Sequence, residues 1–374
     1  MALSRVRFDR GPLRHGTEFA QPLWTIRAGT AAEVGPAFDD IAQAQQAGRW
    51  LAGYASYELG YVLEPKLAPL LPAERELPLL QFGVFEAPAP PPPLAPAHGC
   101  ALTPAAAQWD FARYAAAFRT VLDYLTAGDI YQANLTFPLA TRRTGSAEGL
   151  YAALCRRQPV PHGAFVDLGD GAALLSRSPE LFFSLSSDGR LTTRPMKGTA
   201  PRGESAAEDL ALRRRLQASE KNRAENLMIV DLLRNDMSRV SETGSVRVPE
   251  IFAIEAYETL FQMTSCITSQ VRPGTTVRAL FEALFPCGSI TGAPKLRAMQ
   301  ILHELEAGPR EAYCGTIGWI APDGAMEFNV AIRTLLCRAD GTARMNVGGG
   351  VVYDSTAQDE YAEAILKSRY AYAE

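Results

Sequence analysis

A run of strand-like segments joined by tight turns is the feature of this chain that most constrains its fold. Turn sequences occur at residues 169–171 and 188–189, inside the stretch GAFVDLGDGAALLSRSPELFFSLSSDGRLTTRPMKGT. Residues 314–355 have the same character. Short strands separated by such turns are typical of hairpins.

Helical patterns lie between the strand regions. They are clearest where apolar residues recur at the spacing of one helix face, and they cover residues 31–48, 110–129, 206–236, 276–285 and 356–374. Strand meanders interrupted by helices predict an α+β fold of mostly antiparallel sheets.

A proline-rich segment, APAPPPPLAPA at residues 87–97, interrupts the chain. Such a run favours extended polyproline II and offers few amide donors. We therefore expect an N-terminal region at residues 1–86 that packs on the core, a connector at 87–98, and a main domain at 99–374.

Composition excludes several classes of protein. The 374 residues carry a formal charge of −4, with 47% hydrophobic and 21% charged residues, which is ordinary for a soluble protein and argues against nucleic acid as a partner. Six cysteines and four histidines are scattered without zinc-ligand spacing, so reduced thiols in a cytoplasm are expected. The N-terminus lacks the apolar core of a secretory signal, and no run approaches the ~18 apolar residues of a membrane span.

The segment RPMKGTAPRG, residues 194–203, places one lysine, Lys197, between Arg194 and Arg202. A lysine on a solvated loop needs no such setting, whereas a lysine that must lose its proton does. Positive charge and burial both lower the pKa of an amine. If the two arginines lie near Lys197 in space, we expect them to lower its pKa.

Acidic side chains mark two of the predicted helices. Glu360 and Glu363 share a face of the last helix, with Lys367 one turn beyond, and Glu225 stands where another helix turns apolar. Two helices that offer inward carboxylates could bind Mg²⁺ through oxygen ligands and waters. The alternative is a solvated face with ordinary Glu–Lys pairs.

Glycines are grouped in two places. NVGGGVV places Gly348, Gly349 and Gly350 between strand-like segments, where backbone amides could approach an anion or two strands could cross closely. In CGSITGAPK, Gly288 and Gly292 lead into a helix whose N-terminus could face an anion. The full P-loop pattern is absent, which excludes a nucleotide phosphate site of that kind.

Two charged residues stand in apolar surroundings. Arg333 in NVAIRTL needs a carboxylate partner, from the protein or from a substrate. Glu180 in SRSPELFF could have a raised pKa and act as a general acid, or it could be a satisfied structural carboxylate. Together these features suit a small substrate with more than one carboxylate, held partly by a metal.

The chain resembles the chorismate-utilising enzymes, which include anthranilate, isochorismate, salicylate and aminodeoxychorismate synthases. The resemblance is strongest from about residue 105 to 370, and it rests on GDIYQANLTF, SRSPELFF, RPMKGTAPRG, KNRAENLMIVDLLRND, CGSITGAPK, YCGTIGWI, AIRTL and VGGGVVYDSTAQDEYAEAILKS. It implies a two-lobed sandwich of mostly antiparallel sheets with helices packed outside, and a chorismate-binding catalytic domain at residues 99–374.

The residue at position 197 separates the branches of this family. Anthranilate and salicylate synthases usually carry alanine there, whereas the branch that makes 4-amino-4-deoxychorismate carries lysine in a motif similar to PMKGT. The resemblance implies that Lys197 adds to ring carbon 2 of chorismate while Glu180, as general acid, helps hydroxide leave from carbon 4. Ammonia then attacks carbon 4 and the lysine is expelled. Gln132 stands where isochorismate and salicylate synthases have a water-activating lysine, which argues against hydration at carbon 2.

The resemblance implies the remaining roles position by position. Glu225 and Glu363 match magnesium ligands, with Glu360 as a more distant acid of the Mg²⁺ site. Tyr313 and Arg333 match the pair that holds the enolpyruvyl carboxylate. The other positions that match substrate contacts are Thr291, Gly348, Gly349, Gly350 and Lys367.

Two positions depart from the family pattern. Asn222 stands where many relatives have an acid, which weakens one expected water-bridged contact to the metal. Gln262 stands where several relatives have histidine, which leaves the contacts to the ring open. The short N-terminal region likewise leaves open whether tryptophan binds there.

The supply of ammonia also follows from the resemblance. The chain shows no glutaminase-type nucleophile elbow, so a separate glutamine amidotransferase subunit is expected, in the route to 4-aminobenzoate and folate. An anthranilate-forming enzyme is the alternative, and Lys197 argues against it. A non-catalytic subunit is a further alternative, which the presence of every main site position argues against.

Overall fold

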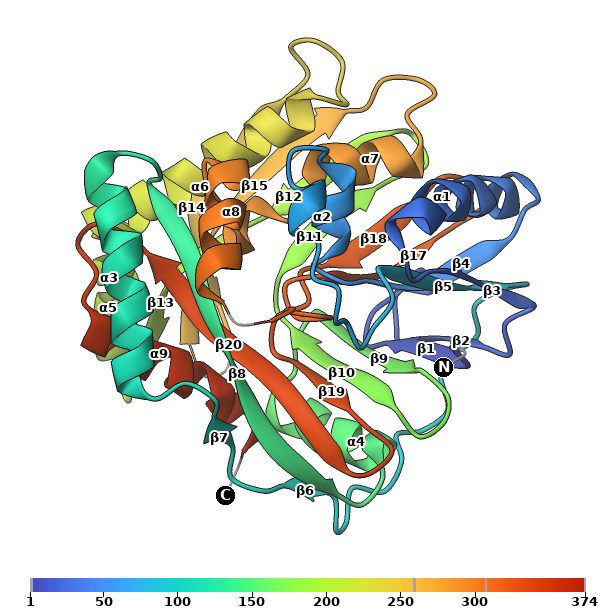
Figure 1. Ribbon diagram of the computed structural model, residues 1–374, viewed down its shortest axis with the longest axis horizontal. Coiled ribbons are helices and arrows are strands. Elements are labelled where there is room, and N and C mark those ends of the chain that lie inside the picture. The colour runs from blue at the N-terminus through green and yellow to red at the C-terminus, as the bar shows by residue number, and fades with distance from the viewer. Residues whose placement is uncertain (1–2, 258–259, 307, 373–374) are drawn as a thin grey trace.

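The computed structural model describes residues 3–257, 260–306 and 308–372. Within these residues, two large sheets face each other and every strand pair is antiparallel (Figure 1). Helices cover the outer faces of the sheets (Figure 1). The predicted α+β sandwich of antiparallel sheets is confirmed.

The first sheet has the strand order β16-β8-β20-β19-β10-β9-β1-β2, and β6 and β7 also pair with β8. Its strands are β1 (Arg5–Phe8), β2 (Thr17–Ala20), β6 (Ala101–Leu102), β7 (Ala106–Ala107), β8 (Gln132–Thr144), β9 (His162–Asp167), β10 (Ala173–Ser178), β16 (Gly292–Ala293), β19 (Thr334–Cys337) and β20 (Thr342–Val351).

The second sheet has the order β13-β15-β12-β11-β18-β17-β4-β5-β3, and β14 pairs with the other edge of β15. Its strands are β3 (Trp24–Ala28), β4 (Trp50–Ala55), β5 (Leu80–Phe85), β11 (Leu181–Leu185), β12 (Arg190–Arg194), β13 (Met196–Pro201), β14 (Arg247–Ala256), β15 (Leu260–Gln270), β17 (Thr316–Ile320) and β18 (Met326–Asn329).

The α-helices fall largely where apolar periodicity predicts them. They are α1 (Ala31–Gln46), α2 (Leu59–Leu63), α3 (Phe111–Ala127), α4 (Ala147–Arg157), α5 (Ala206–Ala218), α6 (Glu220–Ser238), α7 (Val277–Leu284), α8 (Lys295–Leu305) and α9 (Ala357–Lys367). Asp110 caps α3 by accepting from the Arg113 amide at 2.8 Å, and Gly128 ends it with φ of 80°. None of the described helices combines the length with the apolar character that a bilayer crossing requires.

Apolar side chains hold the layers together. Between the sheets, Phe19 of β2 packs on Phe85 of β5 with ring centroids 5.4 Å apart, and Tyr54 and Val166 are buried in the same cluster. Outside, α1, α6 and α7 cover the second sheet, and α3, α8 and α9 cover the first. Burial of apolar surface on both sides of each sheet is the main stabilising contribution.

The expectation of one helix over residues 206–236 was wrong at Ser219. Its backbone is extended, with φ of −66° and ψ of 110°, and its hydroxyl accepts from the Asn222 amide that begins α6. A serine in this conformation ends α5 and caps the next helix. The break gives α6 its own direction, and α6 is the helix that carries Glu225.

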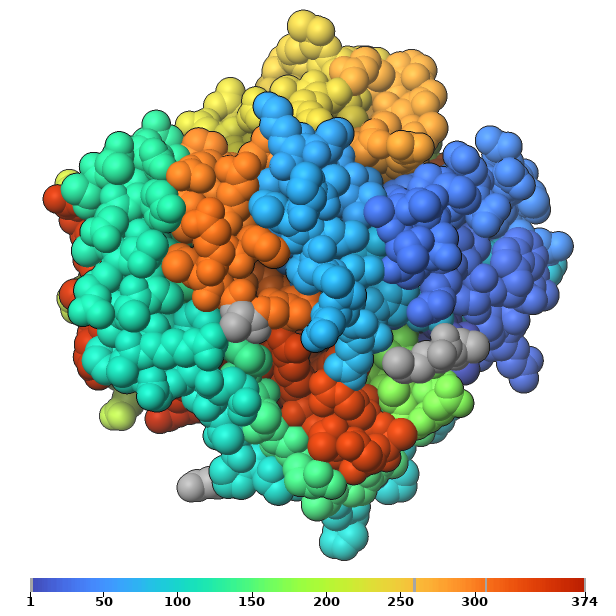
Figure 2. All heavy atoms as spheres, in the orientation of Figure 1, coloured from blue at the N-terminus to red at the C-terminus, as the bar shows by residue number. Residues whose placement is uncertain are grey.

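The N-terminal segment is built into both sheets. Strands β1 and β2 extend the first sheet through β9, and β3, β4 and β5 form the end of the second. Within residues 49–65, β4 is followed directly by the short helix α2. The space-filling view shows α2 (light blue) lying against α8 (orange), where the Tyr61 and His303 rings meet at 5.8 Å (Figure 2).

The proline-rich segment crosses the surface without helix or long strand. It touches the first sheet through a bridge from Glu18 to Ala89 and a 2.7 Å hydrogen bond from Arg7 Nη1 to the Pro92 carbonyl. The segment is thus extended along the surface, as its proline content favours. The domain boundaries at residues 86 and 98 stay predictions.

Candidate active site

Lys197 lies on an edge strand of the second sheet. Strand β13 pairs with β15, but the register shifts between Met196 and Thr199, so the ladder is interrupted at the lysine. A bulge of this kind changes the direction of a side chain. Lys197 is half-buried, and its Nζ donates to the Ser289 carbonyl at 3.2 Å.

Several charged groups act on the Lys197 amine. Burial is the main cause of its lowered pKa, and the Lys367 ammonium lowers it further. The carboxylates of Glu180, Glu225 and Glu363 act in the opposite direction. Acids from three separate segments therefore lie within electrostatic reach of this one amine.

Arg194 and Arg202 do not act on the amine as the sequence suggested. Arg194 pairs with Glu250 and Glu255 at 2.7 and 2.6 Å, and Arg202 pairs with Asp209 at 2.7 Å. Each guanidinium is neutralised by carboxylates of its own. The pKa is lowered as expected, but burial and Lys367 are the causes.

Glu180 lies immediately before β11 and is 4% exposed. Burial raises the pKa of its carboxyl group, against the opposing effects of Ser289 and Lys197. Its Oε1 is buried and has no hydrogen-bond partner in the described part of the chain. A carboxyl group in this state retains its proton more readily and has an oxygen available for a ligand.

Both departures from the family pattern contact the residue after Lys197. Gln262 donates from Nε2 to the Gly198 carbonyl at 2.9 Å. Asn222 packs so closely that a Cβ on Gly198 would lie 3.0 Å from it, and Gly198 has φ of 88°. Gln262 and Asn222 therefore fix the interrupted part of β13.

The predicted acidic residues of α6 and α9 come together. Burial raises the pKa of the Glu225 carboxyl group on α6, and the Glu363 carboxylate on α9 raises it further. Partial desolvation acts to raise the pKa of the Glu363 carboxyl group, which is 58% exposed, but its 2.7 Å pair with Lys367 brings the pKa below the ordinary value. The ordinary Glu–Lys pair is thus present, but it lies within reach of Lys197 and Glu225. Glu360 accepts from the Ser355 hydroxyl at 2.7 Å, and burial raises its pKa.

Side chains of α9 come close to the glycine run of β20. A Cβ on Gly349 would lie 2.8 Å from Glu360 Oε2, and Lys367 Nζ donates to the Gly348 carbonyl at 3.0 Å. Gly350 faces Gln132, whose amide is fully buried and makes no hydrogen bond within the described residues. The glycines therefore permit close packing, and their role as anion donors stays a prediction.

Thr291 supports the loop that faces Lys197. It is fully buried, and its hydroxyl hydrogen-bonds to the carbonyls of Cys287 and Gly288 at 3.2 and 3.3 Å. These bonds hold the 3₁₀ turn Gly288–Ile290, which presents the Ser289 carbonyl to the amine. A direct contact of Thr291 with substrate stays a prediction.

Arg333 precedes β19 in a left-handed backbone conformation, with φ of 51°, rather than standing inside an apolar strand. No carboxylate of the described residues forms an ion pair with it, so the predicted alternative of a structural salt bridge finds no partner there. Burial lowers its pKa, and Glu180 is one of the groups that oppose this effect. An arginine so placed is suited to bind an external carboxylate.

Tyr313 is buried, and burial raises the pKa of its hydroxyl group. The next residue, Cys314, donates its amide to the Ala331 carbonyl at 3.0 Å, so the backbone segment of Tyr313 lies beside the segment that leads to Arg333. No hydrogen bond joins the two side chains in the part of the chain that is described. Their joint grip on a carboxylate stays a prediction.

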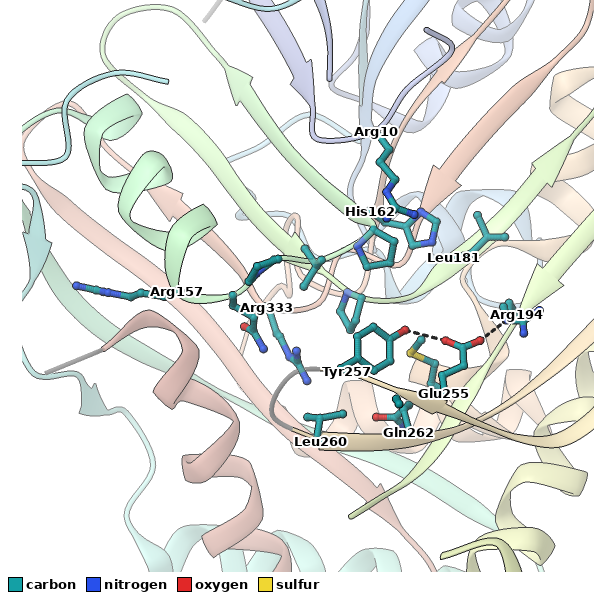
Figure 3. Close-up of a pocket in the computed structure, with 17 residues that line it drawn as sticks. Arg10, Arg157, His162, Leu181, Arg194, Glu255, Tyr257, Leu260, Gln262 and Arg333 are labelled. Carbon is teal, nitrogen blue, oxygen red and sulfur yellow. Dashed lines mark hydrogen bonds and ion pairs between the residues drawn. The ribbon is translucent and has the colours of Figure 1, made fainter. Parts of the chain in front are cut away.

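A cavity of about 710 Å³ adjoins this cluster (Figure 3). Arg333 and Gln262 line it, together with Met196, a neighbour of Lys197, and Leu181, a neighbour of Glu180. Lys197 and Glu180 do not line it, because successive residues of an extended segment point to opposite sides. The volume suits a small organic ligand. Arg10, Arg157 and Arg333 on its walls suit an anion, whereas Arg194 is already paired with Glu250 and Glu255 and the His162 ring with Glu327.

The acidic residues offer a partial metal site. Within the described ranges, no cluster of three or more acidic, histidine or cysteine side chains is assembled as a ready metal cage. Glu225 and Glu363 nevertheless supply carboxylate oxygens from two helices. Mg²⁺ is commonly held by one or two carboxylates together with waters and substrate oxygens, so the donor set fits this ion.

Sequence reasoning missed three residues of this region. Ser289 binds Lys197 through its carbonyl and acts on Glu180 through its hydroxyl. Tyr257 donates to Glu255 at 2.8 Å on the wall of the cavity (Figure 3). The signal was available in part, since Glu255 lies near the end of β14 and Tyr257 is two residues further along the chain.

Comparison with known proteins agrees with this geometry. The chorismate binding enzyme family matches residues 14–372. Aminodeoxychorismate synthase component 1 of Klebsiella aerogenes is 43% identical over 254 residues, which cover 68% of this chain and 56% of the relative. Anthranilate synthase component 1 of Thermus thermophilus is 40% identical over 265 residues, covering 70% and 56%. The chain thus matches little more than half the length of these curated relatives.

The fold agrees as well. The crystal structure of anthranilate synthase component I from Streptococcus pneumoniae TIGR4 superposes with a TM-score of 0.81 at 24% identity, covering 99% of this chain and 92% of that one. At this identity the likeness supports the fold alone. Because the family match spans residues 14–372, and the resemblance to aminodeoxychorismate synthase component I is confirmed by relatives of that name, this chain belongs to the chorismate binding enzymes.

Proposed function

We propose that this chain converts chorismate and ammonia to 4-amino-4-deoxychorismate through a covalent adduct on Lys197. The observation that carries the proposal is a half-buried amine and a buried carboxyl group whose pKa values are displaced in opposite directions. The pKa of the Lys197 amine is lowered and that of the Glu180 carboxyl is raised, and Glu180 Oε1 is unpartnered. An amine and an acid with pKa values displaced in these directions suit a nucleophile and a general acid.

The proposed reaction consists of two substitutions. The Lys197 amine bonds to ring carbon 2, the two ring double bonds shift, and the carbon 4 hydroxyl takes a proton from Glu180 and leaves as water. Ammonia then bonds to carbon 4, the double bonds shift back, and the Lys197 amine leaves carbon 2. The net change exchanges one hydroxyl group for one amino group and regenerates the lysine.

We infer that Arg333 holds one carboxylate of chorismate. Arg333→Gln is expected to raise the KM for chorismate by roughly 10- to 100-fold, because it removes a charge-assisted hydrogen bond worth about 1.5–3 kcal/mol. Steady-state kinetics checks this. Arg297→Gln is the control, since Arg297 pairs with Asp129 at 2.7 Å on the surface. An unchanged KM in Arg333→Gln would assign the arginine a structural role.

We also infer that Glu225 and Glu363 hold Mg²⁺, with Glu360 beside them. When bound, the ion would neutralise carboxylate charge and orient the substrate. The effect of Glu363 on the pKa of Glu225 supports this, because two neighbouring carboxylates are most stable when a cation lies between them.

Glu363→Gln is expected to reduce activity by at least about 100-fold and to weaken Mg²⁺ binding in calorimetry. Folding should change little, because the Glu363–Lys367 pair is 58% and 42% exposed and such pairs contribute under about 1 kcal/mol. Asp359→Asn on the same helix is the control. Full activity of the parent protein in EDTA would exclude the metal.

Ammonia is proposed to come from a separate glutamine amidotransferase subunit. The name of the Klebsiella relative, component 1, supports the existence of another component. A cytoplasmic location is part of the proposal, and the free state of all six cysteines fits it.

Identification of the product tests the proposed function. The protein is incubated with chorismate, Mg²⁺ and ammonium, and the product is analysed with and without an aminodeoxychorismate lyase. We expect 4-aminobenzoate only when the lyase is present. Fluorescent anthranilate would instead favour the second candidate, anthranilate synthesis, which the 40% identity to the Thermus thermophilus enzyme keeps in view.

A further inference from the structure

We propose that Arg194 and Arg202 are positioning residues that hold the strand carrying Lys197 at both ends against the β14–β15 hairpin. The inference rests on the proposed function only in taking Lys197 to be the reacting group. It answers why two arginines flank this lysine although neither acts directly on its charge.

Strand β13 needs such support because its ladder is incomplete. It pairs with β15 on one side only, and no strand of the described residues pairs with its other edge. The register shift at Met196–Thr199 removes ladder hydrogen bonds at the lysine itself. An edge strand with an interrupted ladder depends more on side-chain contacts than a fully paired strand does.

Arg194 anchors the entry to this strand. Its Nε donates to Glu255 Oε1 at 2.6 Å and its Nη2 to Glu250 Oε2 at 2.7 Å. Glu255 also accepts from the Tyr257 hydroxyl at 2.8 Å and from the Thr264 hydroxyl at 3.1 Å. The Glu255 carboxylate of β14 thus connects β12 and β15. Its contact on β12 is Arg194, three residues before Lys197 (Figure 3).

Arg202 anchors the exit. Its Nε and Nη2 bind both oxygens of Asp209 on α5, at 2.7 and 2.8 Å, and its Nη1 donates to the Tyr257 carbonyl at 2.7 Å. The guanidinium also lies over the Phe261 ring, 4.8 Å from its centroid. Tyr257 is therefore contacted through its carbonyl by Arg202 and, by way of Glu255, through its hydroxyl by Arg194.

Planar guanidinium groups suit this task better than lysines. A lysine carries one point charge and cannot bind two carboxylates or both oxygens of one carboxylate with fixed geometry. The ion pairs are also partly exposed, at 31% and 28% for Arg194–Glu255, so each contributes little to global stability. Variants should therefore fold while the lysine loses its position.

The experiment distinguishes an effect of the position of Lys197 from an effect of the local charge. Arg194→Gln and Glu255→Gln break the same contact but change the local charge in opposite directions. Arg194→Lys and Arg202→Lys keep the charge and lose the forked geometry. Arg297→Gln, whose pair with Asp129 lies elsewhere on the surface, is the matched control.

Two readouts are taken. The first is the pH dependence of acetylation of Lys197, followed by mass spectrometry with exposed Lys66 as internal reference, which needs no substrate. The second is ammonia-dependent turnover of chorismate. We expect Arg194→Gln and Glu255→Gln both to raise the apparent pKa of Lys197 by about one unit. We expect kcat to fall by up to about 100-fold, with KM near the parent value, because small displacements of a reacting group have effects of this size. The two lysine variants should show the same change, and Arg297→Gln none.

Opposite shifts in Arg194→Gln and Glu255→Gln, or parent-like behaviour of Arg194→Lys and Arg202→Lys, would overturn the proposal, since either result assigns the effect to charge. Unchanged labelling in every variant would overturn it too. Failure of the proposed function gives a different result. In that case the parent protein does not aminate chorismate, but the labelling of Lys197, which needs no substrate, still tests whether the arginines position it.

Discussion

Lys197→Ala is expected to lower ammonia-dependent amination of chorismate by roughly 10³-fold or more, the largest effect of any substitution in this chain. Removal of a covalent nucleophile takes away the whole two-step route, rather than one stabilising contact. Chorismate should still bind, because Arg333, which we infer holds one of its carboxylates, remains. Turnover measured with a coupled lyase, alongside calorimetry of chorismate binding, checks the result.

Lys197→Arg sharpens this test. It keeps a positive charge near Glu180, but a guanidinium does not deprotonate in proteins and cannot act as the nucleophile. We expect the same loss as in Lys197→Ala. Lys66→Ala, at an exposed position, is the control. Retention of full turnover by Lys197→Ala would end the proposed role of the lysine.

Glu180→Gln has the second largest expected effect, a fall in kcat of roughly 10²- to 10⁴-fold, which is the range attributed to general acid catalysis. The amide keeps the shape of the carboxyl group but has no proton to give the departing hydroxyl. Folding should not suffer, because burial already disfavours the ionised carboxylate at this position. Thermal unfolding of the variant serves as the check on structure.

The pH dependence separates the acid from the nucleophile. Glu180 is active when protonated, so its raised pKa extends activity upward in pH, and activity falls as pH rises beyond it. Lys197 is active when neutral, so its lowered pKa extends activity downward. The two groups interact, so the two limbs of the bell-shaped profile belong to the pair. The residual activity of Glu180→Gln should no longer fall at alkaline pH; an alkaline limb that persists would remove Glu180 from the role of acid.

Local features of the fold were predictable from sequence. Asp110 and Gly128 mark the two ends of α3, and turns occur at residues 169–171 and 188–189, because capping and positive φ depend on neighbouring residues alone. The break at Ser219 was not predicted. Its helix-capping geometry competes with a continuous polar helix pattern that gives no periodic signal of its own.

Contacts distant in sequence were not predictable in the same way. The carboxylates that neutralise Arg194 come from residues 250 and 255, on a strand whose place beside β15 depends on the whole sheet. For this reason the arginines were given the wrong role. The lowered pKa of Lys197 was predicted correctly, but its main cause, burial beneath the turn that carries Ser289, is a tertiary effect. The resemblance to a family brought Glu180, Glu225 and Glu363 together where spacing alone left alternatives open.

Mass spectrometry of the protein incubated with chorismate and Mg²⁺, but without ammonia, tests the central claim most directly. The account predicts that the peptide containing Lys197 gains the mass of chorismate less one water, and that the added mass disappears when ammonium is supplied. An unmodified Lys197 in a preparation that turns over chorismate as soon as ammonium is added, or an adduct on a different residue, would contradict it.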